Sequence, residues 1–126
     1  MDKAKILTVD DSPDMLFLEK MILEQEGFEV LTANNGKTAL EIVSKNSDLS
    51  LILCDVQMET MDGLEFVARL KADHERIFNE TPVVLVTGLD EAPRVKVAGI
   101  IQKNMGLDDF AATVKSFVVS KKSRLT

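Results

Sequence analysis

The sequence predicts an α/β fold: a doubly wound sheet of five parallel strands with helices on both of its faces. Two observations support this prediction. Five short apolar, β-branched runs alternate along the chain with segments of helical periodicity. The third and fourth runs are nearly continuous hydrophobics, which is typical of parallel strands that are buried on both faces. Right-handed crossovers between such strands place helices on both sides of the sheet.

The predicted strands are short and end in polar or turn-forming residues. Their sequences are KILTV at Lys5–Val9, EVLTA at Glu29–Ala33, LSLILC at Leu49–Cys54, PVVLVT at Pro82–Thr87 and GIIQ at Gly99–Gln102. We expect the first and last helices to cover one face of the sheet and the helices between them to cover the other.

The helices are predicted from capping residues and apolar stripes. The first follows Ser12-Pro13, a suitable N-cap and N1 pair, and ends near Gly27, a suitable residue just past a helix end. Met15, Leu18 and Ile22 repeat along it at helical spacing. Three more helices begin at Asn35-Gly36, at Asp62 and near Leu107.

The connection between Thr87 and Gly99 is too short for an ordinary helix. Only GLDEAPRVKVA is available there, and Pro93 lies inside it. If Pro93 occupies the first helical position, little more than one turn remains before Gly99. We therefore predict a shortened or irregular fourth helix.

Length and composition indicate one domain of a protein in the cytoplasm. The chain has 126 residues, which we divide into a domain at 1–120 and a frayed tail at 121–126. The net charge of -6 argues against nucleic-acid binding. The lone Cys54 excludes an internal disulfide and fits a reducing compartment. No apolar run approaches the roughly 18 residues of a membrane span, and the N-terminus lacks a signal-peptide pattern.

Polar residues follow four of the predicted strands and should meet at one edge of the sheet, because ligands of open α/β sheets bind beyond the carboxyl ends of the strands. The first strand ends on Asp10 and Asp11, and the third on Asp55. The fourth ends on Thr87 and the fifth on Lys103. Three close carboxylates repel one another, and oxygen-only ligands suit a hard cation such as Mg²⁺ or Mn²⁺.

Each of these residues also has a simpler interpretation. Asp10 and Asp11 could merely begin a loop and cap the helix that follows, and Asp55 could be a loop acid. Thr87 could be an ordinary strand end and Lys103 a surface lysine. Taken together, they favour a Mg²⁺ site in which an Asp accepts a phosphoryl group, with the hydroxyl and the ammonium holding its oxygens. Asp62, before a glycine, is predicted to be only a helix cap.

The motifs at the strand ends resemble those of one family over essentially the whole chain. These are VDDSP, CDVQMETMDGLEF, VTG and QKN, in this order and spacing. They resemble the response-regulator receiver domain of two-component signalling. The resemblance implies a flavodoxin-like or CheY-like sheet with strand order 2-1-3-4-5.

The resemblance also implies a role for each site residue. Asp55 is the expected phosphoacceptor, and Asp10 and Asp11 bind Mg²⁺ together with Asp55 and the backbone carbonyl of Gln57. Thr87 and Lys103 contact the phosphoryl group. Two positions are expected to tune the lifetime of the phosphorylated state: Gln57 and Leu89.

Three positions depart from the family pattern. Glu59 and Asn104 stand where the family usually has proline, and Ile100 stands at the switch position usually held by Tyr or Phe. The interval from Thr87 to Lys103 is also shorter than usual. The phosphorylation site is thus complete, but its readout is not expected to use the usual coupling between a threonine and an aromatic ring.

These features favour a phosphorylation-switched signalling domain that is not a turnover enzyme and catalyses only its own phosphotransfer and dephosphorylation. Its expected partners are a sensor histidine kinase or a histidine phosphotransfer protein and an output protein, with no nucleic acid and no membrane; a homodimer stays open. One alternative is a phosphorylation-independent binding module, a pseudo-receiver. Another is a Mg²⁺ phosphatase or phosphotransferase, which the absence of a G-x-x-x-x-G-K-[ST] loop and of a D-x-D pair at Asp55 disfavours.

Overall fold

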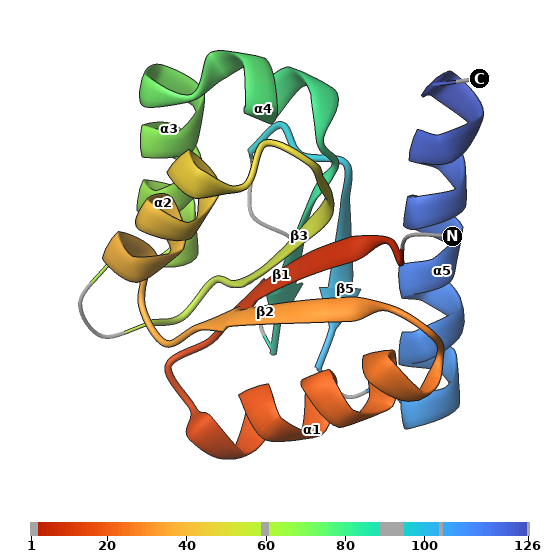
Figure 1. Cartoon of the computed structure of the whole chain (residues 1–126). Coiled ribbons are helices and arrows are strands. Elements are labelled where there is room, and N and C mark those ends of the chain that lie inside the picture. The colour runs from red at the N-terminus through yellow and green to blue at the C-terminus, as the bar shows by residue number, and fades with distance from the viewer. Residues whose placement is uncertain (1–2, 59–60, 89–94, 104, 126) are drawn as a thin grey trace.

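The computed structural model describes residues 3–58, 61–88, 95–103 and 105–125. Its strands form one sheet in the order β2-β1-β3-β4-β5 with every neighbouring pair parallel, as predicted (Figure 1). The strands are β1 Lys5–Val9, β2 Glu29–Ala33, β3 Leu49–Asp55, β4 Val83–Thr87 and β5 Gly99–Gln102.

The helices are α1 Pro13–Gln25, α2 Gly36–Lys45, α3 Gly63–Asp73, α4 Glu75–Glu80 and α5 Leu107–Leu125. The first three begin at the caps that the sequence indicates. The side chains of Ser12, Asn35 and Asp62 each accept a hydrogen bond from a backbone N–H in the first turn of α1, α2 and α3. The capping role predicted for Asp62 is therefore confirmed.

The helix α4 was not predicted from the sequence. It follows α3 directly, with His74 between them, and Ile77 and Phe78 pack against the core. Its six residues are too few for a clear apolar stripe, so no periodicity predicted it.

The helix predicted between β4 and β5 lies mostly outside the described residues, which exclude 89–94 and therefore Pro93. Residues 95–98 are not helical. Val95 and Val97 pack against the core, and the Ala98 N–H donates to the Val83 carbonyl at 2.8 Å. The described part of this connection is thus an irregular segment held against the sheet.

Helices cover both faces of the sheet, with α1 and α5 on one side and α2, α3 and α4 on the other (Figure 1). Alternate strand residues point to opposite faces, so Leu7 and Cys54 pack toward α2 and α3, whereas Ile6 and Leu53 pack toward α1 and α5. On α1 the buried residues are Leu16, Glu19 and Leu23, and the predicted stripe of Met15, Leu18 and Ile22 is only half-buried.

The backbone of the last helix is helical through Leu125. The domain at 1–120 and the frayed tail at 121–126 stay predictions. Within the described residues, no helix combines the length and the apolar character needed to cross a lipid bilayer.

Candidate functional site

Asp10 follows β1 and is held by the turn that begins α1. Its side chain is only 2% exposed. The Ser12 N–H donates to Asp10 Oδ1 at 2.9 Å, and the Asp10 N–H donates to the Ala33 carbonyl at 3.1 Å. Because Ser12 is also the N-cap of α1, the start of this helix fixes the carboxylate at the edge of the sheet.

Asp55 is the last residue of β3 and is equally buried, at 2% exposed. The hydrogen bonding between β3 and β4 extends one residue further, because the Val56 N–H donates to the Val86 carbonyl at 3.1 Å. The chain then returns at Gly63, whose N–H donates to the Val56 carbonyl at 2.9 Å. Backbone hydrogen bonds to β4 and to the start of α3 therefore fix the position of the chain at Asp55.

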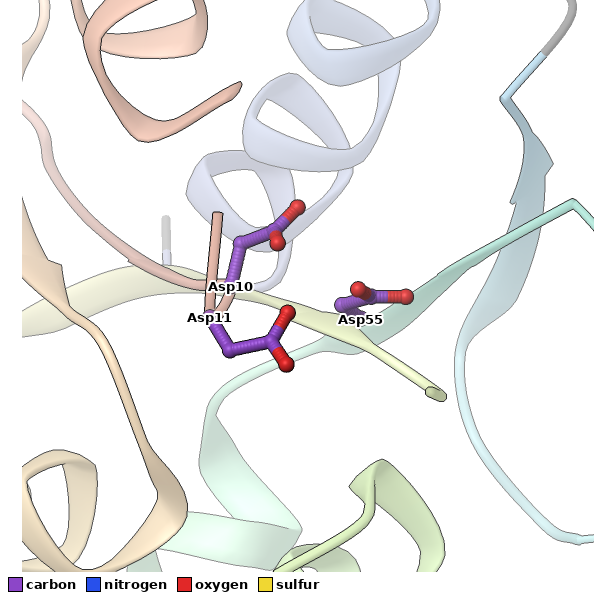
Figure 2. A group of neighbouring side chains, drawn as sticks. All are labelled: Asp10, Asp11 and Asp55. Atoms are coloured by element: carbon purple, nitrogen blue, oxygen red, sulfur yellow. The ribbon is translucent and has the colours of Figure 1, made fainter. Parts of the chain in front are cut away.

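The carboxylates of Asp10, Asp11 and Asp55 gather at the carboxyl end of β1 and β3 (Figure 2). One oxygen of each lies within 4.8 Å of the others. Burial raises the pKa of Asp10 above its ordinary value; the Ser12 hydrogen bond opposes this rise, and the charge of Asp55 adds to it. Asp11 is exposed, so the group is open to solvent on one side.

Lys103 supplies a positive charge to the site from the end of β5. Its ammonium lies 3.0 Å from Asp55 Oδ2, and its side chain is 30% exposed. Burial lowers the pKa of Lys103, but the hydrogen bond and charge of Asp55 outweigh this and raise it above its ordinary value. The Lys103 ammonium therefore stays charged at neutral pH.

Thr87 ends β4 beside this pair. It is fully buried, and its carbonyl accepts a hydrogen bond from the Lys103 N–H at 2.8 Å. Gln57 follows Asp55 by two residues, and its N–H donates to Asp55 Oδ1 at 3.2 Å. The five strand-end residues predicted from the sequence therefore come together at one edge of the sheet.

The family model of the response regulator receiver domain matches residues 6–115. The chain belongs to this family.

Known receiver domains resemble this chain in both sequence and structure. Chemotaxis protein CheY1 of Helicobacter pylori is 37% identical over 84 residues, which are 66% of each chain. The transcriptional regulatory protein CpxR of Escherichia coli is 33% identical over 106 residues, covering 84% of this chain and 41% of CpxR. This receiver domain thus spans less than half the length of that relative.

Two solved structures share the fold. The chemotaxis protein CheY4 of Vibrio cholerae superimposes with a TM-score of 0.82 at 28% identity, covering 92% of this chain and 99% of CheY4. The response regulator TrrA of Thermotoga maritima, solved in complex with Mg²⁺-BeF, superimposes with a TM-score of 0.75 at 26% identity, covering 90% of this chain and 98% of TrrA. Both confirm the receiver fold.

Of the three positions that depart from the usual receiver pattern, the described residues include Ile100. Ile100 is half-buried and packs against the core on the face that carries α2 and α3. Glu59, Leu89 and Asn104 lie outside the described residues, so the lifetime-tuning role of Leu89 stays a prediction.

One buried acid of this receiver domain was not singled out in the sequence. Glu19 is 4% exposed, and the Thr8 hydroxyl donates to its Oε1 at 2.8 Å. Burial raises the pKa of Glu19 from 4.5 to about 7. The available signal was its spacing, because Glu19 falls between Leu16 and Leu23 on the face of α1 that packs on the sheet.

Proposed function

We propose that this receiver domain accepts a phosphoryl group on Asp55 in a Mg²⁺-dependent reaction and thereby switches its contacts with other proteins. The observation that supports this most is the position of Asp55: buried, paired with Lys103 at 3.0 Å, and joined by Asp10 and Asp11 within 4.8 Å. The donor would be a sensor histidine kinase or a histidine phosphotransfer protein.

The donor set fits Mg²⁺. Three carboxylates that offer only oxygen, one of them exposed, match a hard cation that keeps part of its water shell. Asp10, Asp11, Asp55 and the backbone carbonyl of Gln57 would hold the ion. The bound cation would offset the mutual repulsion of the acids and the charge of the phosphoryl oxygens.

Transfer needs little from the chain beyond positioning and charge. An oxygen of Asp55 attacks the phosphorus, a P–O bond forms, and the P–N bond of the phosphohistidine breaks, leaving the electron pair on the imidazole nitrogen. Lys103 would move its hydrogen bond from the carboxylate to a phosphoryl oxygen, and the Thr87 hydroxyl would donate to another. Water would later release the phosphate, so each cycle ends by autodephosphorylation.

The donor is expected to dock on α1. Phe17 is 70% exposed and Met21 is 41% exposed, which is unusual for large apolar side chains of one helix. Replacing Phe17 with Ala is expected to slow transfer from a phosphorylated histidine protein but to leave phosphorylation by acetyl phosphate unchanged. Equal slowing with both donors would contradict docking at this face.

The proposal is tested by incubating the protein with Mg²⁺ and acetyl phosphate or phosphoramidate and weighing the intact chain. We expect one phosphoryl adduct on the wild type and none on Asp55→Ala. Asp62→Ala is the matched control, because it removes an acid that caps α3. An adduct that survives Asp55→Ala, or no adduct on the wild type, would refute the proposal.

A pseudo-receiver would behave differently in the same experiment. Because Ile100 replaces the usual aromatic residue, a partner could bind without reading Asp55. Its affinity would then be the same for the wild type, the phosphorylated protein and Asp55→Ala. We expect instead that phosphorylation changes partner affinity, and that steady multiple turnover of a phosphomonoester is not observed.

A further inference from the structure

Glu19 is the buried acid that the proposed phosphotransfer does not use. It lies in the middle of α1 and faces the sheet, where Thr8 on β1 donates a hydrogen bond to it at 2.8 Å. Hydrophobic side chains surround it: Met15, Leu18, Ile22, Leu107 and Phe110 line the same small cavity of about 50 Å³. A carboxylate in such surroundings is costly unless a positive charge is near.

Lys103 provides that charge. Its side chain lines the same cavity as Glu19, and its ammonium ends on Asp55. The charge of Glu19 helps to raise the pKa of Lys103, and the charge of Lys103 acts to lower the pKa of Glu19. The lysine therefore lies in the field of Asp55, Asp10 and Glu19, and of these Glu19 shares the cavity that its side chain lines.

The other charged groups that act on Glu19 come from the phosphorylation site itself. They are Asp10 at the end of β1 and Asp55 at the end of β3, and both raise the pKa of Glu19. From α5, the side chains that line the cavity are the apolar Leu107 and Phe110. An ionised Glu19 is thus repelled by the two acids and attracted by Lys103 alone among these groups.

We propose that Glu19 is a positioning residue for Lys103: its buried carboxylate draws the ammonium away from Asp55 and so weakens the hold of the site on a phosphoryl group. This inference rests on the proposed function of Asp55. A phosphoryl group adds about -1.5 to -2 charge at neutral pH. With Glu19 ionised, the lysine is shared between this new charge and the carboxylate on α1; with Glu19 neutral, this competition is absent.

The test measures the affinity of beryllium fluoride with Mg²⁺, a phosphoryl analogue, for the intact protein. The chain contains no Trp or Tyr, so calorimetry or amide NMR is the suitable readout. Glu19→Gln keeps the shape of the side chain and an acceptor for the Thr8 hydroxyl but removes the charge. Glu24→Gln is the matched control, because it makes the same change on the exposed face of α1.

At about pH 8, Glu19→Gln is expected to bind the analogue roughly tenfold more tightly than the wild type, the effect of one unit charge at an effective dielectric constant of about 20. At about pH 6, below the value near which wild-type Glu19 titrates, the two proteins should bind alike. Glu24→Gln should match the wild type at both pH values. Glu19→Met also removes the charge, so it should bind the analogue about as tightly as Glu19→Gln does at pH 8.

A further variant separates action through the lysine from direct repulsion. In a Lys103→Met background, Glu19→Gln should improve binding by less than about threefold, because the lysine that it releases is absent.

Three results would overturn the inference alone while the wild type still binds the analogue: equal affinities at pH 8, the same gain at both pH values, or the full gain without Lys103. No binding by the wild type would overturn the proposed function together with this inference.

Discussion

Gly63 is the point where the start of α3 touches the end of β3, and replacing it tests how tightly Asp55 is held. A Cβ at this position would lie 2.8 Å from the Val56 Cα and closer still to the Asp55 carbonyl oxygen. Both are backbone atoms of the strand end, so neither can rotate away. Gly63→Ala must therefore shift the segment that carries the proposed phosphoacceptor.

The expected cost follows from overpacking. Forcing a methyl group into a filled site costs about 1–3 kcal/mol, and the better helix propensity of alanine returns less than about 1 kcal/mol at a helix end. We expect a net loss of about 2 kcal/mol in the free energy of unfolding. We also expect slower phosphorylation by acetyl phosphate, because the Asp55 carboxylate moves relative to Lys103.

Urea unfolding followed by far-UV circular dichroism measures the stability, and the mass of the intact chain measures phosphorylation. Gly106→Ala is the matched control, because the new Cβ would lie 3.9 Å from Asp109 Oδ2, an ordinary van der Waals distance. Neither glycine has a positive φ, so backbone strain does not differ between the two changes. Wild-type stability and phosphorylation rate in Gly63→Ala would refute the reasoning.

Three further predictions concern a cap, a buried acid and the metal. Asn35→Ala removes the hydrogen bond that the Thr38 N–H donates at 2.8 Å and should cost about 1 kcal/mol in urea unfolding; an unchanged midpoint would contradict the capping role. Because Glu19 has its pKa raised from 4.5 to about 7 in the folded state, that state holds the proton more tightly, so stability falls as pH rises through this window. The loss in the free energy of unfolding is roughly 3 kcal/mol. Glu19→Gln should abolish this pH dependence when unfolding is measured without Mg²⁺, and parallel pH profiles of the wild type and the variant would contradict the prediction. Finally, Mg²⁺ at about 100 times its dissociation constant should stabilise the protein by about 2.7 kcal/mol, and Asp11→Asn should reduce this gain.

Much of the architecture could be predicted because it depends on local pattern. Continuous hydrophobic runs at β3 and β4 indicated strands buried on both faces, and the structure confirms the parallel sheet. The caps Ser12, Asn35 and Asp62 marked helix starts because a side-chain oxygen next to free backbone N–H groups acts within one turn. The short α4 was missed because six residues carry too little periodicity.

The candidate site likewise has features that the sequence could predict and features that it could not. Asp10, Asp11, Asp55, Thr87 and Lys103 could be named in advance, because parallel strands bring their carboxyl ends to one edge whatever the details of packing. Three features could not be predicted, since each depends on how strands and helices meet. They are the burial of these residues, the 3.0 Å contact between Lys103 and Asp55, and the hydrogen bond from the Gly63 N–H to the Val56 carbonyl.

The sequence by itself determined the five strands, the helices α1, α2, α3 and α5 and which residues end the strands, because these follow from periodicity, capping and chain direction. Only the tertiary structure decided which charges share a low-dielectric space. Glu19 shows the difference: along the chain it is one acid among many on a helix, and its burial beside Thr8 and Lys103 exists only once α1 packs on β1 next to α5. Electrostatic effects of this kind depend on distance and burial, which a linear pattern does not contain.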